Sequence, residues 1–238
     1  MGMVMRYKIK ILYALPFLFF AYHCYASAYS DTSDLFPSKT VYFGVNMGGG
    51  YTTWKYLLDT TDQGSQQPSL PSRVKEGGPS WGVVFGFDVA KNFAIELQYM
   101  EFADAHVDFA PGSSYFDSNG NPVTSMVSKT DAYSLSGKFF VPVGVQTHLR
   151  AFAAVGAGLV ERRDPLIDED PNGLPPGNVT LSCVSPYMSA GLDYNFTRHW
   201  IVESGFQYYT GFGASEINPV DSFVPFAWDA YGRLAYQL

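Results

Sequence analysis

Cysteine is scarce in this sequence, with only Cys24 and Cys183 among 238 residues. Cys24 lies in a segment that has the features of an export signal, so an exported chain keeps Cys183 alone. A single cysteine can form neither a disulfide within the chain nor a cysteine-based zinc site. The fold must therefore be held together by backbone hydrogen bonds and side-chain packing.

Basic residues are also few, 15 against 22 acidic ones, and three of them lie within the first ten residues. Residues 1–28 contain no acidic side chain, so the chain without this segment has a formal net charge of −10. Binding to a phosphate backbone requires a basic surface. We therefore expect no nucleic-acid partner.

Apart from Ile11 to Tyr22, the sequence has no long apolar run. This run is itself shorter than the roughly 20 residues that a membrane-spanning helix needs. This run follows three basic residues and precedes small residues spaced for signal peptidase, which predicts a signal peptide over 1–28 with cleavage after Ala26 or Ala28. A lipoprotein at Cys24 and an uncleaved anchor are the weaker alternatives. No later run is long enough for a membrane helix.

Aromatic residues (17%) and glycines (23) are abundant, and they fall in segments where apolar and polar residues alternate. In residues 81–89 the apolar side chains occupy every odd position, which puts them on one face of a strand. The same period of two predicts eight strands, at about 40–51, 80–89, 93–103, 131–141, 149–160, 185–195, 200–210 and 226–238.

Short and long connections alternate strictly between these strands. Three are tight, at 90–92, 142–148 and 196–199, whereas the others are long and polar, at about 52–79, 104–130, 161–184 and 211–225. Transmembrane barrels have short periplasmic turns and long extracellular loops. We therefore predict an all-β fold, an eight-stranded antiparallel up-and-down transmembrane β-barrel over 40–238, after a short N-terminal periplasmic segment at 29–39.

A soluble β-sandwich or a lipocalin-like barrel is the alternative architecture. Such folds bury their apolar face, and periodicity alone does not distinguish inside from outside. Aromatic residues gather near the predicted strand ends, as at Trp81, Tyr99, Trp200 and Tyr236. This placement is typical of the aromatic belts at membrane interfaces and favours the membrane barrel.

At the level of motifs, the chain resembles the OmpA-like outer-membrane β-barrel superfamily, in the compact branch without a periplasmic peptidoglycan-binding domain. The resemblance covers essentially all of the chain after the leader and is carried by Val41–Val45, Ile95–Tyr99, Val155–Gly158, Tyr194–Trp200 and Gly232–Leu238. It implies that the barrel-assembly machinery recognises the C-terminal strand, 226–238. The chain ends in leucine, where this family often has an aromatic residue.

The charged residues expected to point inward are the main candidate site. They are Asp88, Glu96, Lys138, Arg150, Asp193, Glu203, Asp229 and Arg233. Eight strands leave an interior just wide enough for side chains, and an unpaired buried charge is costly. These residues are therefore predicted to form a salt-bridge network that fills the lumen. A small gated pore, in which the pairs exchange partners, is the alternative.

Two other patterns of residues bear on catalysis and metal binding. His106, His148 and His199 do not lie beside a serine in the way a hydrolase needs, so we expect neither an enzyme nor a cofactor. The segment with Asp168, Asp170 and Asn172 is similar to the opening of a calcium loop, but it lacks the final glutamate and flanking helices. It is at most a weak metal site, and an acidic solvated loop is the simpler interpretation.

The resemblance and the pattern together predict a non-enzymatic bacterial outer-membrane protein. It would contribute to envelope integrity or contact host surfaces and serum factors through its long loops, because loops on rigid scaffolds usually carry binding. Expected partners are outer-membrane lipid, lipopolysaccharide, the assembly machinery and host surface ligands. Two alternatives remain open: a small gated pore or transporter of small or hydrophobic solutes, and a soluble secreted β-barrel binding protein.

Overall fold

The computed structural model describes residue 36 and residues 38–54, 71–109, 124–144, 148–165, 178–211 and 224–238. The predicted signal peptide lies outside these residues. The strands are β1 (Thr40–Thr52), β2 (Pro71–Lys75), β3 (Gly78–Ala90), β4 (Phe93–Glu101), β5 (Ala105–Phe109), β6 (Ser125–Pro142), β7 (Leu149–Pro165), β8 (Asn178–Asn195), β9 (Trp200–Tyr209) and β10 (Ala227–Gln237). Among the described residues, no helix is both long and apolar enough to cross a bilayer.

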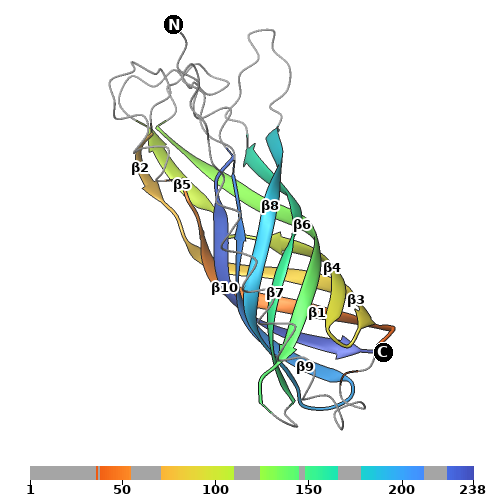
Figure 1. Cartoon of the computed structure of the whole chain (residues 1–238). Helices are drawn as coiled ribbons and strands as arrows, with labels where there is room; N and C mark the ends of the chain where they lie inside the picture. Colours follow the sequence, from red (N-terminus) through yellow and green to blue (C-terminus); the bar gives the residue numbers. More distant parts are fainter. Residues whose placement is uncertain are drawn as a thin grey trace, which may run out of the picture.

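Eight of these strands close into a ring (Figure 1). Their order around the ring is β1, β3, β4, β6, β7, β8, β9 and β10, and every pair is antiparallel. The first strand pairs with the last, and the Leu238 N–H donates to the Val41 carbonyl at 2.9 Å beside this seam. The predicted eight-stranded up-and-down barrel is confirmed.

Several strands are longer than the sequence pattern indicated. β6, β7 and β8 continue into the ranges expected to be loops, 104–130 and 161–184, and the short antiparallel strands β2 and β5 pair with each other and add to the wall there. The alternation persists in β6, where Met126, Ser128 and Thr130 are buried. The outward residues of these extensions are largely polar, so the apolar signal used to find the strands ends before the strands do.

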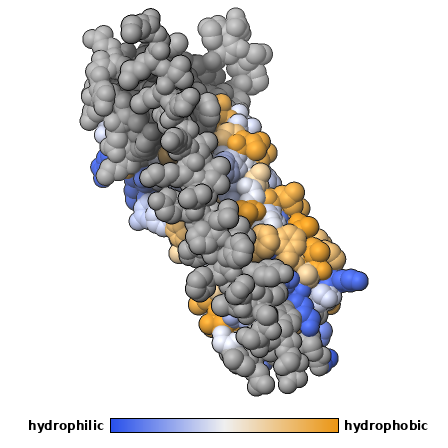
Figure 2. All heavy atoms as spheres, in the orientation of Figure 1, coloured by the Kyte–Doolittle hydropathy of each residue, from blue (hydrophilic) through white to orange (hydrophobic). Residues whose placement is uncertain are grey.

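The outer wall of the barrel is apolar, whereas its interior combines buried polar and charged side chains with two clusters of buried apolar ones. Phe85, Leu97 and Leu135 are neighbours in register on adjacent strands, and all three are more than half exposed. Figure 2 shows hydrophobic residues gathered along the middle of the wall, with hydrophilic residues toward both ends. A soluble barrel would bury its apolar face, so this surface is suited to contact lipid.

Aromatic side chains border the apolar band at both of its edges. Near one edge the ring of Tyr99 lies 5.9 Å from Trp81 and 5.1 Å from Tyr133. Near the other, Trp200 packs edge-on against Tyr236 at 5.0 Å. Paired belts of this kind mark the two membrane interfaces.

The two ends of the barrel differ in their connections. The turns after β3, β6 and β8 are short and lie at the same end as the C-terminus (Figure 1). We call this the short-turn end, and the opposite end, to which β2 and β5 belong, the long-loop end. Most of the long connections fall outside the described residues.

Candidate functional site in the barrel interior

The centre of the lumen contains four charged side chains from four different strands. Glu96 extends from β4, Lys138 from β6, Glu203 from β9 and Arg233 from β10, and each is at most 3% exposed. We call these four residues the central quartet. They meet because inward positions of a closed barrel face one another across a narrow interior.

Each cation of the quartet contacts both carboxylates. Lys138 Nζ lies 2.9 Å from Glu96 Oε1 and also pairs with Glu203. Arg233 Nη1 lies 2.8 Å from Glu96 Oε1 and 3.2 Å from Glu203 Oε2. Two positive and two negative charges therefore cancel in a region that contains almost no solvent-exposed surface. Mutual pairing of this kind offsets the desolvation of buried charges.

Uncharged residues complete the hydrogen bonding of the quartet. Tyr42 donates to Glu96 at 2.6 Å, and Tyr231 donates to Glu203 at 2.7 Å. Arg233 donates from Nε to Asn46 Oδ1 at 2.6 Å and from Nη2 to Gln98 Oε1 at 2.7 Å. Sequence reasoning missed these residues because it counted only charges. Their inward position in the alternating pattern was the available signal.

A second ion pair lies toward the short-turn end. Arg150 Nε donates to Asp193 Oδ1 at 2.8 Å, between adjacent residues of β7 and β8. The guanidinium also lies over two aromatic rings, 3.8 Å from the centroid of Phe140 and 4.2 Å from that of Phe36. Cation–π contacts in a desolvated site add to the stability of the charged form.

The remaining two inward carboxylates are not part of the quartet. Within the described chain, Asp88 accepts hydrogen bonds from Gln237 at 2.7 Å and from Thr40 at 3.3 Å, and Asp229 accepts one from Ser80 at 2.9 Å. No ion pair to a described cation is formed by either. Hydrogen bonds from neutral groups satisfy a buried carboxylate less completely than a cation does.

The long-loop end contains a further buried cation that the sequence analysis assigned to a loop. Arg162, on the extension of β7, is 1% exposed and pairs with Asp164 on the same strand. Its guanidinium lies 4.5 Å from the ring centroid of Trp54, which is fully buried just after β1. Arginine–aromatic contacts therefore occupy the lumen at both ends.

Little empty space remains among these side chains. A cavity of about 10 Å³ lies between the central quartet and the Arg150–Asp193 pair, lined by Tyr42, Asp88 and Ile201 among others. This volume holds about one water molecule. The lumen at this level is filled by side chains.

The other candidates from the sequence lie elsewhere. His148 and His199 are at the short-turn end, where each Nδ1 lies within 3.0 Å of a backbone carbonyl oxygen, and His106 is on the outer face of β5. In the described ranges, no group of three or more His, Cys, Asp or Glu side chains is placed to hold a metal. Asp168, Asp170 and Asn172 lie outside those ranges.

Comparisons with known proteins agree with this architecture. Neisserial surface protein A is 9% identical, with a TM-score of 0.51 over 83% of this chain and 97% of that protein. The barrel domain of Pseudomonas aeruginosa OprF (12% identity, TM-score 0.44, 84% and 98% coverage) and Yersinia pestis Ail (10%, 0.44, 85% and 100%) align at lower scores. No curated protein matches the sequence significantly.

The first of these structures shares the eight-stranded barrel fold, which its TM-score supports at this low identity. The profile of the OmpA-like transmembrane domain matches residues 37–228, about four fifths of the chain. An apolar outer wall, two aromatic belts and a charged, filled lumen are the features that a membrane barrel of this size requires. The protein is a bacterial outer-membrane β-barrel, and its chain belongs to the OmpA-like transmembrane domain family.

Proposed function

We propose that this protein is a non-enzymatic barrel with a closed lumen, which contributes to envelope integrity and holds binding loops at the cell surface. The observation that carries this proposal is the central quartet. Arg233 alone makes hydrogen bonds to four side chains from three strands, namely Asn46, Glu96, Gln98 and Glu203. Cross-lumen bonds of this kind stiffen the wall on which the loops are mounted.

The same observation argues against the gated-pore alternative. Opening a path through the quartet would require Arg233 or Lys138 to leave both of its carboxylates. Breaking a buried pair without replacing its partner costs about 3–5 kcal/mol. A cavity of about 10 Å³ beside the quartet offers no room to which either cation could move.

The proposal includes an orientation and a route of export. Residues 1–28 direct secretion, the short-turn end faces the periplasm, and the long-loop end faces the medium. The outward alternation of Leu234, Tyr236 and Leu238 in and after β10 presents an apolar edge for the barrel-assembly machinery. Lipopolysaccharide surrounds the wall, and host surface ligands are the partners proposed for the loops.

Planar-bilayer recording tests the closed lumen. The purified full chain is expected to produce no discrete conductance, and Glu203→Ala is expected to introduce one, because it removes a carboxylate that pairs with both cations. A discrete conductance in the unmodified protein, changed in size by Arg150→Ala or Glu203→Ala, would instead establish a pore. The heat-modifiable gel mobility of folded barrels reports whether each variant is folded.

Loop deletion in the native host tests the surface role. Shortening each long connection within 55–70, 110–123 and 166–177 leaves the described strands intact. Cell attachment is expected to fall, whereas sensitivity to detergents and bile salts is expected to stay constant. Deletion of the whole gene should raise that sensitivity. If no loop deletion changes attachment, the binding role of the loops is wrong.

A further inference from the structure

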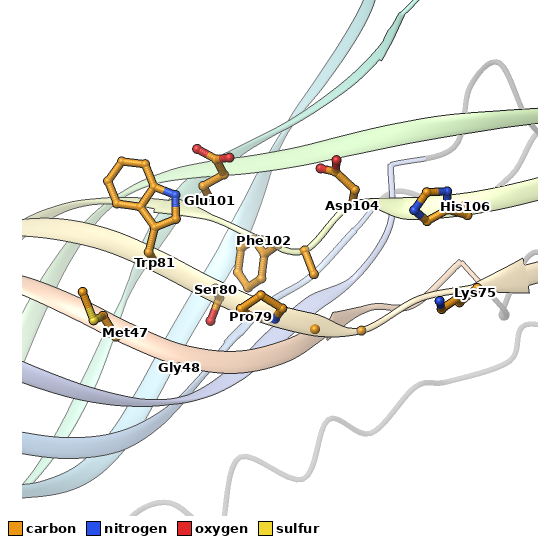
Figure 3. Close-up of a pocket in the computed structure, with 13 residues that line it drawn as sticks. Met47, Gly48, Lys75, Pro79, Ser80, Trp81, Glu101, Phe102, Asp104 and His106 are labelled. Atoms are coloured by element: carbon orange, nitrogen blue, oxygen red, sulfur yellow. The ribbon is translucent and has the colours of Figure 1, made fainter.

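The outer wall contains a pocket where the β3–β4 pair meets the β2–β5 pair. It has a volume of about 650 Å³, within the range of ligand sites. Figure 3 shows Met47 and Trp81 at one end, Lys75 and His106 at the other, and Asp104 between them. No contact of the central quartet involves these residues, so the pocket is separate from the lumen site.

Glycine at the bend creates this pocket. Between β2 and β3 the chain passes through Gly77, whose φ of 91° is in the region that favours glycine. A Cβ atom at Gly77 would overlap the ring of Tyr51, so the bend also requires the absence of a side chain. On the neighbouring strand the pairing is interrupted between Glu101 and Ala105. The two breaks lie side by side and open the wall.

The end of the pocket at Met47 and Trp81 belongs to the lipid-facing surface. Met47 and Trp81 are paired in register and are 70% and 46% exposed. Trp81 also packs edge-on against Tyr99 in the aromatic belt. A ligand at this end is therefore in contact with hydrocarbon and needs an acyl chain.

Hydrogen-bond acceptors border the apolar end and continue beyond it, and donors line the far end of the pocket. Glu101 lies beside Trp81, its partner in register, and Asp104 is an exposed residue three positions later in the chain. Lys75 and His106 are paired in register on the outer face of the β2–β5 pair, and both are exposed. The pocket thus has an apolar end bordered by Glu101, Asp104 in its middle and a basic end at Lys75 and His106.

We propose that this pocket binds an acylated, phosphorylated sugar of the outer leaflet, the chemistry of the lipid A part of lipopolysaccharide. The acyl chain lies along Met47 and Trp81. The amide and hydroxyl donors of the sugar meet Glu101 and Asp104, and the phosphate meets Lys75 and His106. The inference rests on the proposed orientation, which places this end of the barrel in the outer leaflet.

The order of charges distinguishes this ligand from simpler ones. A glycerophospholipid presents its phosphate directly above its acyl chains, where this pocket has carboxylates. A free sugar phosphate would leave the apolar end empty. The described residues also contain no three-ligand metal group, so the carboxylates do not form a protein-only cation site.

Native mass spectrometry of the folded full chain in a neutral detergent tests the assignment. The probes are lipid A, the same glycolipid without phosphates, phosphatidylglycerol and glucosamine 1-phosphate. Lipid A is expected to bind at least fivefold more tightly than each other probe. The double variant Lys75→Ala/His106→Ala should lose at least about fivefold in lipid A affinity, since the charge of one lysine near a membrane surface contributes about 1 kcal/mol toward an anionic group. Lys129→Ala, an exposed cation of β6 outside the pocket, is the matched control and should leave the affinity unchanged.

Substitution of the two carboxylates tests whether the pocket recognises the sugar. Glu101→Gln/Asp104→Asn should weaken lipid A binding and strengthen phosphatidylglycerol binding, because only the sugar uses them as acceptors. If both lipids bound equally more tightly, the assignment of the carboxylates to the sugar would be wrong. If Lys75→Ala/His106→Ala left the lipid A affinity unchanged, the assignment of this pocket as the binding site would be wrong. Protease accessibility of the long loops on whole cells tests the orientation separately, so failure of the proposed function is distinguishable from failure of this site.

Discussion

Arg233 Nη1 lies 2.8 Å from Glu96 Oε1 at the centre of the barrel, although 137 positions separate the two residues in the sequence. The contact crosses the lumen between β10 and β4, which are not neighbours in the sheet. It therefore connects two strands that β1 and β3 separate in the wall, in addition to the hydrogen bonds that run around the ring.

Glu96→Gln should destabilise the barrel strongly. The substitution leaves Lys138 and Arg233 with one carboxylate between them, and breaking a buried pair typically costs about 3–5 kcal/mol. The measurement is the free energy of urea unfolding of the protein in lipid vesicles, followed by tryptophan fluorescence. Asp104→Asn, at an exposed position, is the control and should change that free energy by less than about 0.5 kcal/mol.

Restoring neutrality should recover part of this loss. In the double variant Glu96→Gln/Lys138→Met one cation and one carboxylate remain, Arg233 and Glu203, which lie 3.2 Å apart. The two substitutions should therefore be less destabilising together than the sum of their separate effects, by about 0.5–3 kcal/mol. Strict additivity would mean that the quartet does not act as an electrostatic unit.

Trp54→Ala should make Arg162 reactive. The indole lies 4.5 Å from the guanidinium carbon, and Arg162 is 1% exposed at the long-loop end of the lumen. Removal of the ring should admit phenylglyoxal, detected as an adduct on the Arg162 peptide by mass spectrometry. Arg163, with a side chain 45% exposed, should react in both proteins and serves as the internal control.

Gly86→Ala should destabilise the barrel, whereas Gly232→Ala should not. A Cβ at Gly86 would overlap the ring of Tyr42, which donates to Glu96, but at Gly232 the nearest atom is 4.0 Å away. Overpacking in a filled core costs about 1–3 kcal/mol. Urea midpoints in vesicles report both effects, and equal midpoints would show that Tyr42 can move without loss.

Leu97→Arg tests the contact of the wall with lipid. Leu97 is 57% exposed in the middle of the apolar band, where an arginine should cost about 2–4 kcal/mol in a bilayer. Ser125→Arg, exposed on the extension of β6 beyond the band, should have little effect. In a soluble barrel both substitutions would be tolerated equally, which the vesicle unfolding assay would reveal.

The strands could be predicted because the membrane imposes a strict alternation on them. Phe85, Leu97 and Leu135 contact hydrocarbon and must be apolar, so the period of two is visible wherever the wall crosses the band. Beyond it, outward residues such as Lys129 face water, and the alternation loses its contrast. For this reason the ends of β6, β7 and β8 were underestimated.

The composition of the interior could be predicted, but its pairing could not. Glu96 and Glu203 were expected inward from their strand positions alone. Which cation each one meets depends on the stagger of the strands around the ring, which brings residues of β4, β6, β9 and β10 to one level. No local pattern in the sequence records that stagger. Asp88 and Asp229 consequently fell outside the quartet, with hydrogen bonds in place of ion pairs.

The seam between β1 and β10 has a consequence for how the protein is made. It joins groups as distant in the chain as Thr40 and Gln237, 197 positions apart. Until β10 arrives, two strand edges have unpaired backbone groups, which hydrocarbon does not tolerate, and the two glutamates of the quartet share a single cation. Insertion into the bilayer and closure of the ring must therefore be one late event, completed only after the final strand has been synthesised.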